Sequence, residues 1–253
     1  MNLRPRDYDS PALPLSYAAI EVRQRVLRPA REVNARRKSR IRPHLCAIFR
    51  RALNAPMPIP RLILASISAS RKSMLRGAGV VFEALPSGVD EATLKSGFSG
   101  SPDALASALA LAKANAVSAR HPEALVIGAD QLLVCDDKIY DKPRNLAEAG
   151  AHLQALSGRT HHLLTSVCLV QGGAQQWLHA EQATLTMRAL SDDFLAAYLT
   201  AEAAEILRCV GAYRLEGLGA QLFTRIEGDY FTVLGLPLLA LLGALRARGV
   251  LAA

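Results

Sequence analysis

Residues 62–72 place an apolar strand directly before a serine-rich turn and a helix that begins with two cations. The segment runs Leu62-Ile63-Leu64-Ala65-Ser66-Ile67-Ser68-Ala69-Ser70-Arg71-Lys72. Small side chains let backbone N–H groups approach an oxyanion, and the positive end of the helix adds to the charge of Arg71. The same pattern is typical of an ordinary strand-to-helix turn with Ser70 as the N-cap residue. The segment predicts a strand followed by a helix and allows a phosphate site between them.

Strand and helix patterns continue to alternate along the chain, which predicts an α/β fold. Helices are expected at residues 72–77, 102–120, 145–156, 191–203 and 237–248, and strands at 61–66, 80–85, 125–128, 132–135, 161–170, 176–187, 221–226 and 230–234. Ser101 and Ser191 are the expected N-cap residues of two of the helices. Asp136-Asp137 lies where a hairpin should turn, so we assign this acidic pair no chemistry.

The excess of positive charge lies before residue 57. The net charge of the chain is +8, but residues 1–56 hold thirteen Arg and Lys against four acids, whereas residues 57–253 hold 17 cations and 18 acids. We therefore expect a basic, flexible extension over residues 1–56 and a folded domain over residues 57–253. The extension could instead contact nucleic acid or an anionic surface, direct the chain to an organelle, or precede a functional chain that starts at Met57.

Cysteine and histidine patterns predict neither a disulfide framework nor a zinc site. The four cysteines are scattered without a C-x-x-C pair, and the adjacent His161 and His162 would point to opposite faces of a strand. The longest apolar run, residues 234–245, is too short to cross a bilayer. We expect a globular protein in a reducing compartment, without membrane contact.

A series of short motifs occurs in the order and approximate spacing of the Maf family, and the resemblance covers essentially everything after Met57. The motifs are Leu64-Ala65-Ser66-x-Ser68-x-x-Arg71, Val89-Asp90-Glu91, Ala112-Lys113-Ala114, Ile127-Gly128-Ala129-Asp130, Asp141-Lys142-Pro143, Leu156-Ser157-Gly158-Arg159-Thr160, Gly211-Ala212-Tyr213, Glu216-Gly217-Leu218-Gly219 and Gly235-Leu236-Pro237. The resemblance implies a mixed twisted sheet with flanking helices that form a two-lobed cleft, as in Maf and ITPase-like folds.

The same resemblance implies an activity. Maf-like enzymes are nucleoside triphosphate pyrophosphatases that cleave between the α and β phosphates with a divalent metal. Family members have also been connected with arrest of cell division and with removal of modified nucleotides, a house-cleaning role. By resemblance we expect a cytoplasmic hydrolase that binds nucleoside triphosphates, for which a homodimer is plausible.

The motif residues include suitable ligands for a polyphosphate. Arg71, with the hydroxyls of Ser66 and Ser68, would hold phosphate oxygens, because a guanidinium can make bidentate contacts with them. Lys113 and Lys142 would add point charges that reach the same phosphates. Each lysine could equally be an ordinary solvated cation, so the prediction depends on the whole series of motifs.

Two acidic motif residues are candidates for the chemical step. Asp130 follows a buried strand at its carboxyl end, where sites form in α/β proteins, and is our candidate proton acceptor. Glu91 and Asp130 are the candidate metal ligands, with Asp90 as the neighbour of Glu91. Hard oxygen donors indicate Mg²⁺ or Mn²⁺. Asp130 could also merely cap a turn, and Asp90-Glu91 could be a solvated loop pair.

Gln131 and Glu216 are the residues that bear on the base. The Maf branch resembling dTTP/UTP pyrophosphatases usually has Thr and Gln at these positions, whereas Gln131 and Glu216 are as in the branch associated with 7-methyl-GTP. A carboxylate at position 216 could accept from the N–H edge of guanine but would repel the carbonyls of uracil and thymine. That second branch, however, tends to carry an aromatic residue where this chain has Ser70. The preferred base therefore stays open.

Two other classes of function remain open. A nucleic-acid-binding module would use the basic residues 1–56, although no nucleic acid is expected for the domain itself. A regulatory protein that binds nucleotides without cleaving them would keep the phosphate-holding residues but would not need Asp130.

Overall fold

A computed structural model describes residues 60–252, so the extension predicted over residues 1–56 lies outside the described residues. The strands are β1 (Leu62–Leu64), β2 (Glu83–Ala84), β3 (Leu125–Cys135), β4 (Lys138–Tyr140), β5 (Thr160–Gln171), β6 (Ala174–Met187) and β7 (Phe223–Glu227). In this part of the chain they form one seven-stranded sheet in the order β2-β1-β3-β5-β6-β7, with β4 pairing β3 off this path. Strand β1 pairs with β2 and β3 in parallel and the other pairs are antiparallel, so the sheet is mixed.

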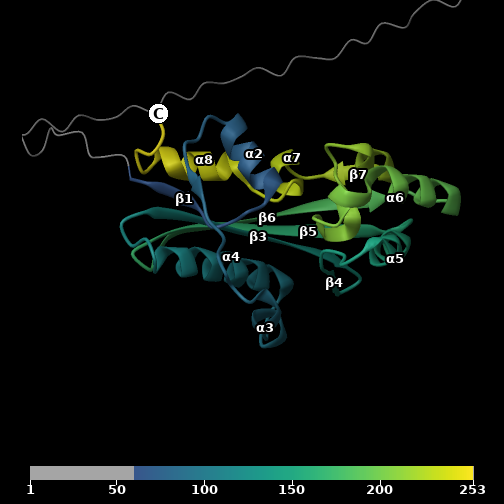
Figure 1. The fold of residues 1–253 in the computed structure, drawn as a ribbon, viewed down its shortest axis with the longest axis horizontal. Helices are drawn as coiled ribbons and strands as arrows, with labels where there is room; N and C mark the ends of the chain where they lie inside the picture. Colours follow the sequence, from purple (N-terminus) through teal and green to yellow (C-terminus); the bar gives the residue numbers. More distant parts are fainter. Residues whose placement is uncertain (1–59, 253) are drawn as a thin grey trace, which may run out of the picture. The chain divides into compact units, whose positions relative to one another are not determined.

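Helices lie against both faces of this sheet (Figure 1). They are α2 (Ala69–Gly77), α3 (Glu91–Ser96), α4 (Pro102–Ser118), α5 (Leu146–Leu156), α6 (Asp192–Ile206), α7 (Tyr230–Val233) and α8 (Leu238–Arg246), with short 3₁₀ turns η1 (Val210–Ala212) and η2 (Leu218–Leu222). Helix α4 covers one face, and α2, α7 and α8 lie along the other. The predicted α/β class with a mixed sheet and flanking helices is confirmed.

The alternating side chains of β3 build a core on each face of the sheet. Val126 packs with α4, whereas Leu125 and Ile127 pack with α2 and α8. Farther along the same strand, Leu133 and Cys135 belong to a separate cluster with α5 and α6. The hydrophobic core is therefore divided between the two ends of the sheet, and β3 joins them.

One edge of β3 is left without a partner strand in the middle. On that edge β1 pairs with residues 125–127 and β4 pairs with residues 133–135, so residues 128–132 lie in a gap between the two. The opposite edge pairs with β5 without interruption from Val126 to Val134. Asp130 and Gln131 lie in this gap, and their side chains point to opposite faces because strand residues alternate.

Most predicted elements are present, but three expectations are wrong and one helix was not predicted. Residues 230–234 form helix α7 rather than a strand, because the Asp229 side chain caps the turn by accepting from the N–H of Thr232. The two short strands expected at 125–128 and 132–135 are one continuous strand. Helix α3 had no periodic signal, and Asp90 is its N-cap residue. Ser68, rather than Ser70, caps α2 by accepting from the N–H of Arg71.

The predicted caps and turns elsewhere are confirmed. The side chains of Ser101 and Ser191 accept from the first turns of α4 and α6. Asp136 and Asp137 both have positive φ, as a two-residue hairpin turn requires. Within the described residues no helix is both long and apolar enough to cross a bilayer.

Gly128 permits the close contact between β3 and α4, and its replacement tests this packing. A Cβ atom at Gly128 would lie 2.2 Å from the carbonyl oxygen of Ala110 and 2.8 Å from the Cβ of Ala114. We expect Gly128→Ala to lower the free energy of unfolding by about 3 kcal/mol, because the helix must move away. Gly77→Ala is the matched control, since a Cβ there meets nothing within 4 Å. This change should raise the free energy of unfolding by no more than about 1 kcal/mol. Urea denaturation of both variants measures the difference.

Candidate active site

A cavity of about 330 Å³ opens at the gap in β3, between the two ends of the sheet. It is lined by eight of the residues predicted from the sequence: Ser68, Arg71, Glu91, Lys113, Asp130, Gln131, Lys142 and Glu216. Ser66 does not line it and lies behind Arg71, whose Nη1 donates to the Ser66 hydroxyl at 3.4 Å. The structure thus brings together side chains that are more than 140 residues apart in the sequence.

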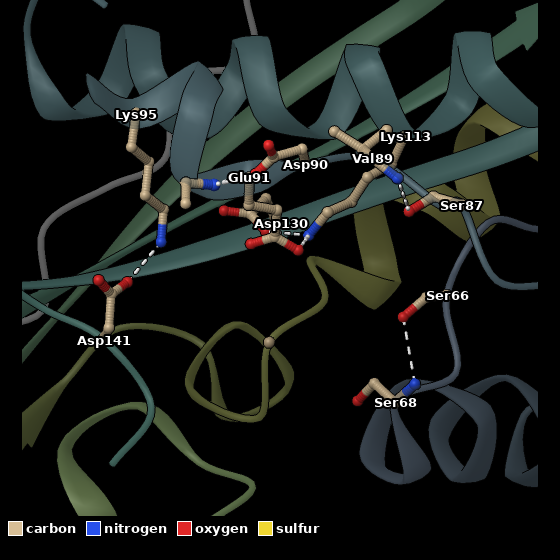
Figure 2. A network of polar contacts seen from close by, with 12 residues as sticks. Ser66, Ser68, Ser87, Val89, Asp90, Glu91, Lys95, Lys113, Asp130 and Asp141 are labelled. Atoms are coloured by element: carbon tan, nitrogen blue, oxygen red, sulfur yellow. Dashed lines mark hydrogen bonds and ion pairs between the residues drawn. The ribbon is translucent and has the colours of Figure 1, made fainter. Parts of the chain in front are cut away.

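Lys113 lies between two carboxylates that come from different elements. Its Nζ is 2.5 Å from Oδ1 of Asp130 on β3 and 2.8 Å from Oε1 of Glu91 on α3. Figure 2 shows the three side chains converging beneath α4. Lys113 and Asp130 are buried, whereas Glu91 is half-exposed. Two carboxylates that share one ammonium group could also share a metal ion.

Helix α3 delivers Glu91 to the pocket, and polar contacts hold the helix in place. The Asp90 side chain accepts from the N–H groups of Ala92 and Thr93, so Asp90 caps α3 and does not line the cavity. Lys95 on the same helix pairs with Asp141 (Figure 2), and both side chains line the cavity. Partial burial alone would raise the pKa of Glu91, but the hydrogen bond and charge of Lys113, with two further lysines, lower it overall.

Arg71 is held from two sides at the start of α2. Its Nε donates to the carbonyl oxygen of Gly235 at 2.8 Å, and its Nη1 donates to Ser66. Burial lowers the pKa of the guanidinium, and the charges of Asp130 and Glu91 partly offset this effect. No ion pair to Arg71 is found within residues 60–252, so its charge is available to a ligand.

Lys142 adds a cation from the loop between β4 and α5. Although much of its side chain is exposed, desolvation lowers the pKa of the ammonium, and the positive charges of Arg71 and Lys113 lower it further. The carboxylates of Glu91 and Asp130 act in the opposite direction without reversing the shift. Burial and the neighbouring cations thus make the protonated form of Lys142 less favourable than that of an ordinary solvated lysine.

Leu163 and residues 208–216 complete the lining of the cavity. Besides Leu163, Tyr213 and Leu215 they include the charged side chains of Arg208, Arg214 and Glu216. Nε of Arg214 lies 3.8 Å from Oε1 of Glu216, and Nη1 of Arg214 pairs with Glu202 at 3.4 Å. Nε2 of the buried His161 contacts the hydroxyl of Tyr213 at 2.9 Å, and burial lowers the pKa of His161 to about 4, which keeps the ring neutral near pH 7.

Sequence reasoning missed several residues that line the cavity. They are Ser70, Lys95, Asp141, Arg208, Cys209, Val210, Tyr213, Arg214, Leu215, Leu163, Val233, Leu234 and Gly235. Asp141, Tyr213 and Gly235 stand inside motifs that were recognised, so proximity to a motif could have found them. Lys95 and Arg208 carried no signal, because each is a single cation in a segment without a pattern.

Glu91 and Asp130 are the carboxylates that could hold a metal ion in this cavity. Within the described residues no group of three or more His, Cys, Asp or Glu side chains gathers as a metal site. Mg²⁺ commonly uses one or two protein carboxylates and completes its shell with water and substrate phosphates. The donor set therefore fits Mg²⁺ or Mn²⁺ only together with a phosphate ligand.

Replacing Lys113 tests whether this cation neutralises the two carboxylates. We expect Lys113→Met to lower the free energy of unfolding by about 3 kcal/mol, because Asp130 would be left buried beside Glu91 without its ion-pair partner. Lys95→Met removes a cation from the more exposed pair with Asp141. This change should lower the free energy of unfolding by less than about 1 kcal/mol. Guanidinium denaturation measures both variants, and an equal loss of unfolding free energy in the two would contradict the role of Lys113 in neutralising the carboxylates.

Comparison with known proteins supports the resemblance over the same part of the chain. A family model described as Maf-like protein matches residues 61–248. A 7-methyl-GTP pyrophosphatase from Rhizobium etli is 49% identical over 195 residues, which cover 76% of this chain and 98% of that protein. A nucleoside triphosphate pyrophosphatase from Granulibacter bethesdensis is 50% identical over 194 residues, with coverage of 76% and 98%.

A third relative extends the comparison to another bacterium. A nucleoside triphosphate pyrophosphatase from Nitrobacter hamburgensis is 48% identical over 191 residues, which cover 75% of this chain and 95% of that protein. The region matched by the family model contains all the residues that line the cavity, since these lie between Ser68 and Gly235. The chain therefore belongs to the family of Maf-like proteins.

Proposed function

We propose that this protein hydrolyses nucleoside triphosphates between the α and β phosphates and releases a nucleoside monophosphate and pyrophosphate. The observation that carries the proposal is the convergence of Arg71, Lys113 and Lys142 around Asp130 in one cavity. Relatives that are 48–50% identical over nearly their whole length are named for this activity. The substrate is accordingly a nucleotide with a polyphosphate tail.

The electrostatics of the cavity favour a polyanion. Arg71 and Lys142 have lowered pKa values because desolvation, and for Lys142 also its cationic neighbours, disfavours their charged forms. A triphosphate would relieve this repulsion and supply acceptors for the guanidinium and the two ammonium groups. Binding energy is then available at the phosphates, where the reacting bond lies.

Asp130 is the proposed proton acceptor for the attacking water. The water oxygen forms a bond to the α-phosphorus, its proton passes to the Asp130 carboxylate, and the bond from the α-phosphorus to the bridging oxygen breaks. Pyrophosphate leaves with that oxygen, and Arg71 and Lys142 stabilise the charge that develops on it. Lys113 keeps the Asp130 carboxylate in a fixed orientation through their contact at 2.5 Å.

A divalent cation, Mg²⁺ or Mn²⁺, is the proposed cofactor, with Glu91 and Asp130 as its protein ligands. When bound it supplies Lewis-acid neutralisation of the phosphate oxygens. Glu91 and Asp130 suit this role because both reach the same ammonium group, and the lowered pKa of Glu91 keeps its carboxylate ionised at neutral pH.

A narrower candidate is a preference for 7-methyl-GTP. The relative from Rhizobium etli is named for that substrate, and Glu216 presents a carboxylate to the cavity. A carboxylate can accept from the N–H edge of a guanine. We further propose a cytoplasmic enzyme, in which removal of modified nucleotides is a suitable task; a homodimer remains an expectation.

The activity is tested by incubating the full chain and Asp130→Asn with canonical and methylated nucleoside triphosphates and Mg²⁺ or Mn²⁺. Wild-type protein should release pyrophosphate, and the variant should lose about 100-fold or more in kcat, because the amide cannot accept the proton. Binding of a triphosphate with a non-hydrolysable α–β bridge should be largely kept. Orthophosphate alone, or no release from any substrate, would refute the proposed reaction.

The lowered pKa of Lys142 predicts a pH dependence of substrate binding. Below that pKa the ammonium is charged and binds phosphate, and as pH rises through it the charge is lost and KM increases. This increase should begin at lower pH than an ordinary lysine would allow. Lys142→Arg should remove it, because arginine stays protonated, whereas Lys72→Arg, outside the cavity, should not. Identical KM profiles for Lys142→Arg and wild type would contradict the assignment.

A further inference from the structure

Lys95 and Asp141 form an ion pair inside the cavity that the proposed reaction does not use. Lys95 lies on α3, and Asp141 directly follows β4, 46 residues farther along the chain. Nζ of Lys95 donates to Oδ1 of Asp141, and both side chains line the cavity (Figure 2). The pair therefore connects two segments of the site that are distant in the sequence.

Each partner of this ion pair is close in sequence to a residue of the proposed site. Lys95 follows Glu91 by about one turn of α3, so the two side chains lie on the same face of the helix. Asp141 immediately precedes Lys142 in the loop between β4 and α5. The charges of Lys95 and Lys142 both lower the pKa of Glu91, which is expected of groups that lie close together. The ion pair thus joins the segment of Glu91 to the segment of Lys142.

Helix α3 has few contacts that fix its position. None of its six residues is fully buried, although Leu94 packs against an apolar cluster that includes residues of α4. Among the ion pairs in the described part of the chain, two reach α3: Glu91 pairs with Lys113, and Lys95 pairs with Asp141. Under the proposed function Glu91 also serves a metal ion, which competes with Lys113 for the same carboxylate. The pair of Lys95 and Asp141 is then the ionic contact that keeps α3 in place.

The loop that carries Lys142 is fixed on both sides of this residue. Tyr140, at the end of β4, and Pro143 are buried, whereas Asp141 and Lys142 between them are exposed. Within residues 60–252 the ammonium group of Lys142 has no ion-pair partner. The direction of Lys142 therefore depends on how the short exposed stretch is held, and Asp141 supplies its ionic contact with α3.

We propose that the ion pair of Lys95 and Asp141 positions the site, because it holds α3 against the loop between β4 and α5. Glu91 and Lys142 are thereby presented to the same polyphosphate tail. This rests on the proposed function, in which Lys142 binds the phosphates and Glu91 a metal ion. Lys95 acts through Asp141 and is not itself a phosphate ligand.

Amide hydrogen exchange of the ligand-free protein tests the anchoring of α3 directly. In Lys95→Met and Asp141→Asn the amides of residues 91–97 should exchange about fivefold faster than in wild type, because one contact of the helix is lost. Asp136→Asn is the matched control, since Asp136 pairs with Arg159 and its side chain is 67% exposed against 65% for Asp141. Asp136 does not line the cavity, so this variant should leave the exchange of α3 unchanged. Wild-type exchange rates in Asp141→Asn would overturn the proposal.

Calorimetric titration with inorganic triphosphate separates positioning from direct phosphate binding. The full chain with Lys95→Met or Asp141→Asn should bind triphosphate about fivefold more weakly than wild type, since Lys142 is no longer held toward it. The titrations are made in EDTA, so that the effect belongs to the side chains and not to a divalent metal. If Lys95 bound phosphate itself, Asp141→Asn would release its ammonium group and tighten binding. Tighter or unchanged binding in Asp141→Asn would therefore refute the positioning role.

A double variant and a conservative variant test whether Lys95 and Asp141 act as one unit. Lys95→Met combined with Asp141→Asn should lose no more triphosphate affinity than either change alone, because the same contact is removed in each case. Lys95→Arg should bind like wild type, since a guanidinium can also pair with the carboxylate. Additive losses, or a loss in Lys95→Arg as large as that in Lys95→Met, would contradict the proposal. Melting temperatures accompany each variant, and Lys95→Gln replaces Lys95→Met if the latter does not fold.

Turnover distinguishes a failure of this inference from a failure of the proposed function. Wild-type protein that releases no pyrophosphate from any nucleotide contradicts the function itself, whereas hydrogen exchange still measures the anchoring of α3. In an active enzyme, Asp141→Asn should raise KM about fivefold and change kcat by less than about twofold, because the contact of Asp130 with Lys113 is kept. A lower kcat with an unchanged KM would count against the positioning of Lys142.

Discussion

The contact of one ammonium group with two carboxylates joins three elements of this fold. Lys113 on α4 meets Asp130 on β3 and Glu91 on α3, and without it the buried Asp130 would have no ion-pair partner. Helix α3 has six residues, and the ion pairs of Glu91 and Lys95 hold it together with Leu94, which packs against an apolar cluster that includes residues of α4. The charge balance around Asp130 and the placement of α3 therefore both involve Lys113.

The cavity itself follows from the pairing of β3. Because β1 ends at Leu64 and β4 ends at Tyr140, opposite Leu133, the middle of β3 has no partner strand on one edge while β5 supports it on the other. Alternation then sends Asp130 toward α4 and Gln131 toward α7. At this single break in strand pairing, Asp130 meets the ammonium group of Lys113. The next residue, Gln131, contacts the segment 232–235 that holds Arg71.

The sequence predicts the fold class and most elements because strand and helix periodicity is strong in long segments such as α4 and β5. It fails where a local cap decides a short segment: Asp229 caps α7 although aromatic and β-branched residues there favour a strand. The motifs identify the charged residues that share the cavity. They do not reveal that Ser66 supports Arg71 from behind or that the amide of Gln131 is already occupied, since both depend on long-range geometry.

Cations gather in the cavity around Asp130, and under the proposed function this would give a bound nucleotide a direction. Desolvation lowers the pKa of Arg71 and of Lys142, and the charges of Arg71 and Lys113 lower that of Lys142 further. Phosphate oxygens would relieve this unfavourable arrangement. A nucleotide bound with its tail at these cations would bring its phosphates to the Asp130 carboxylate. Orientation and catalysis would then have one electrostatic origin.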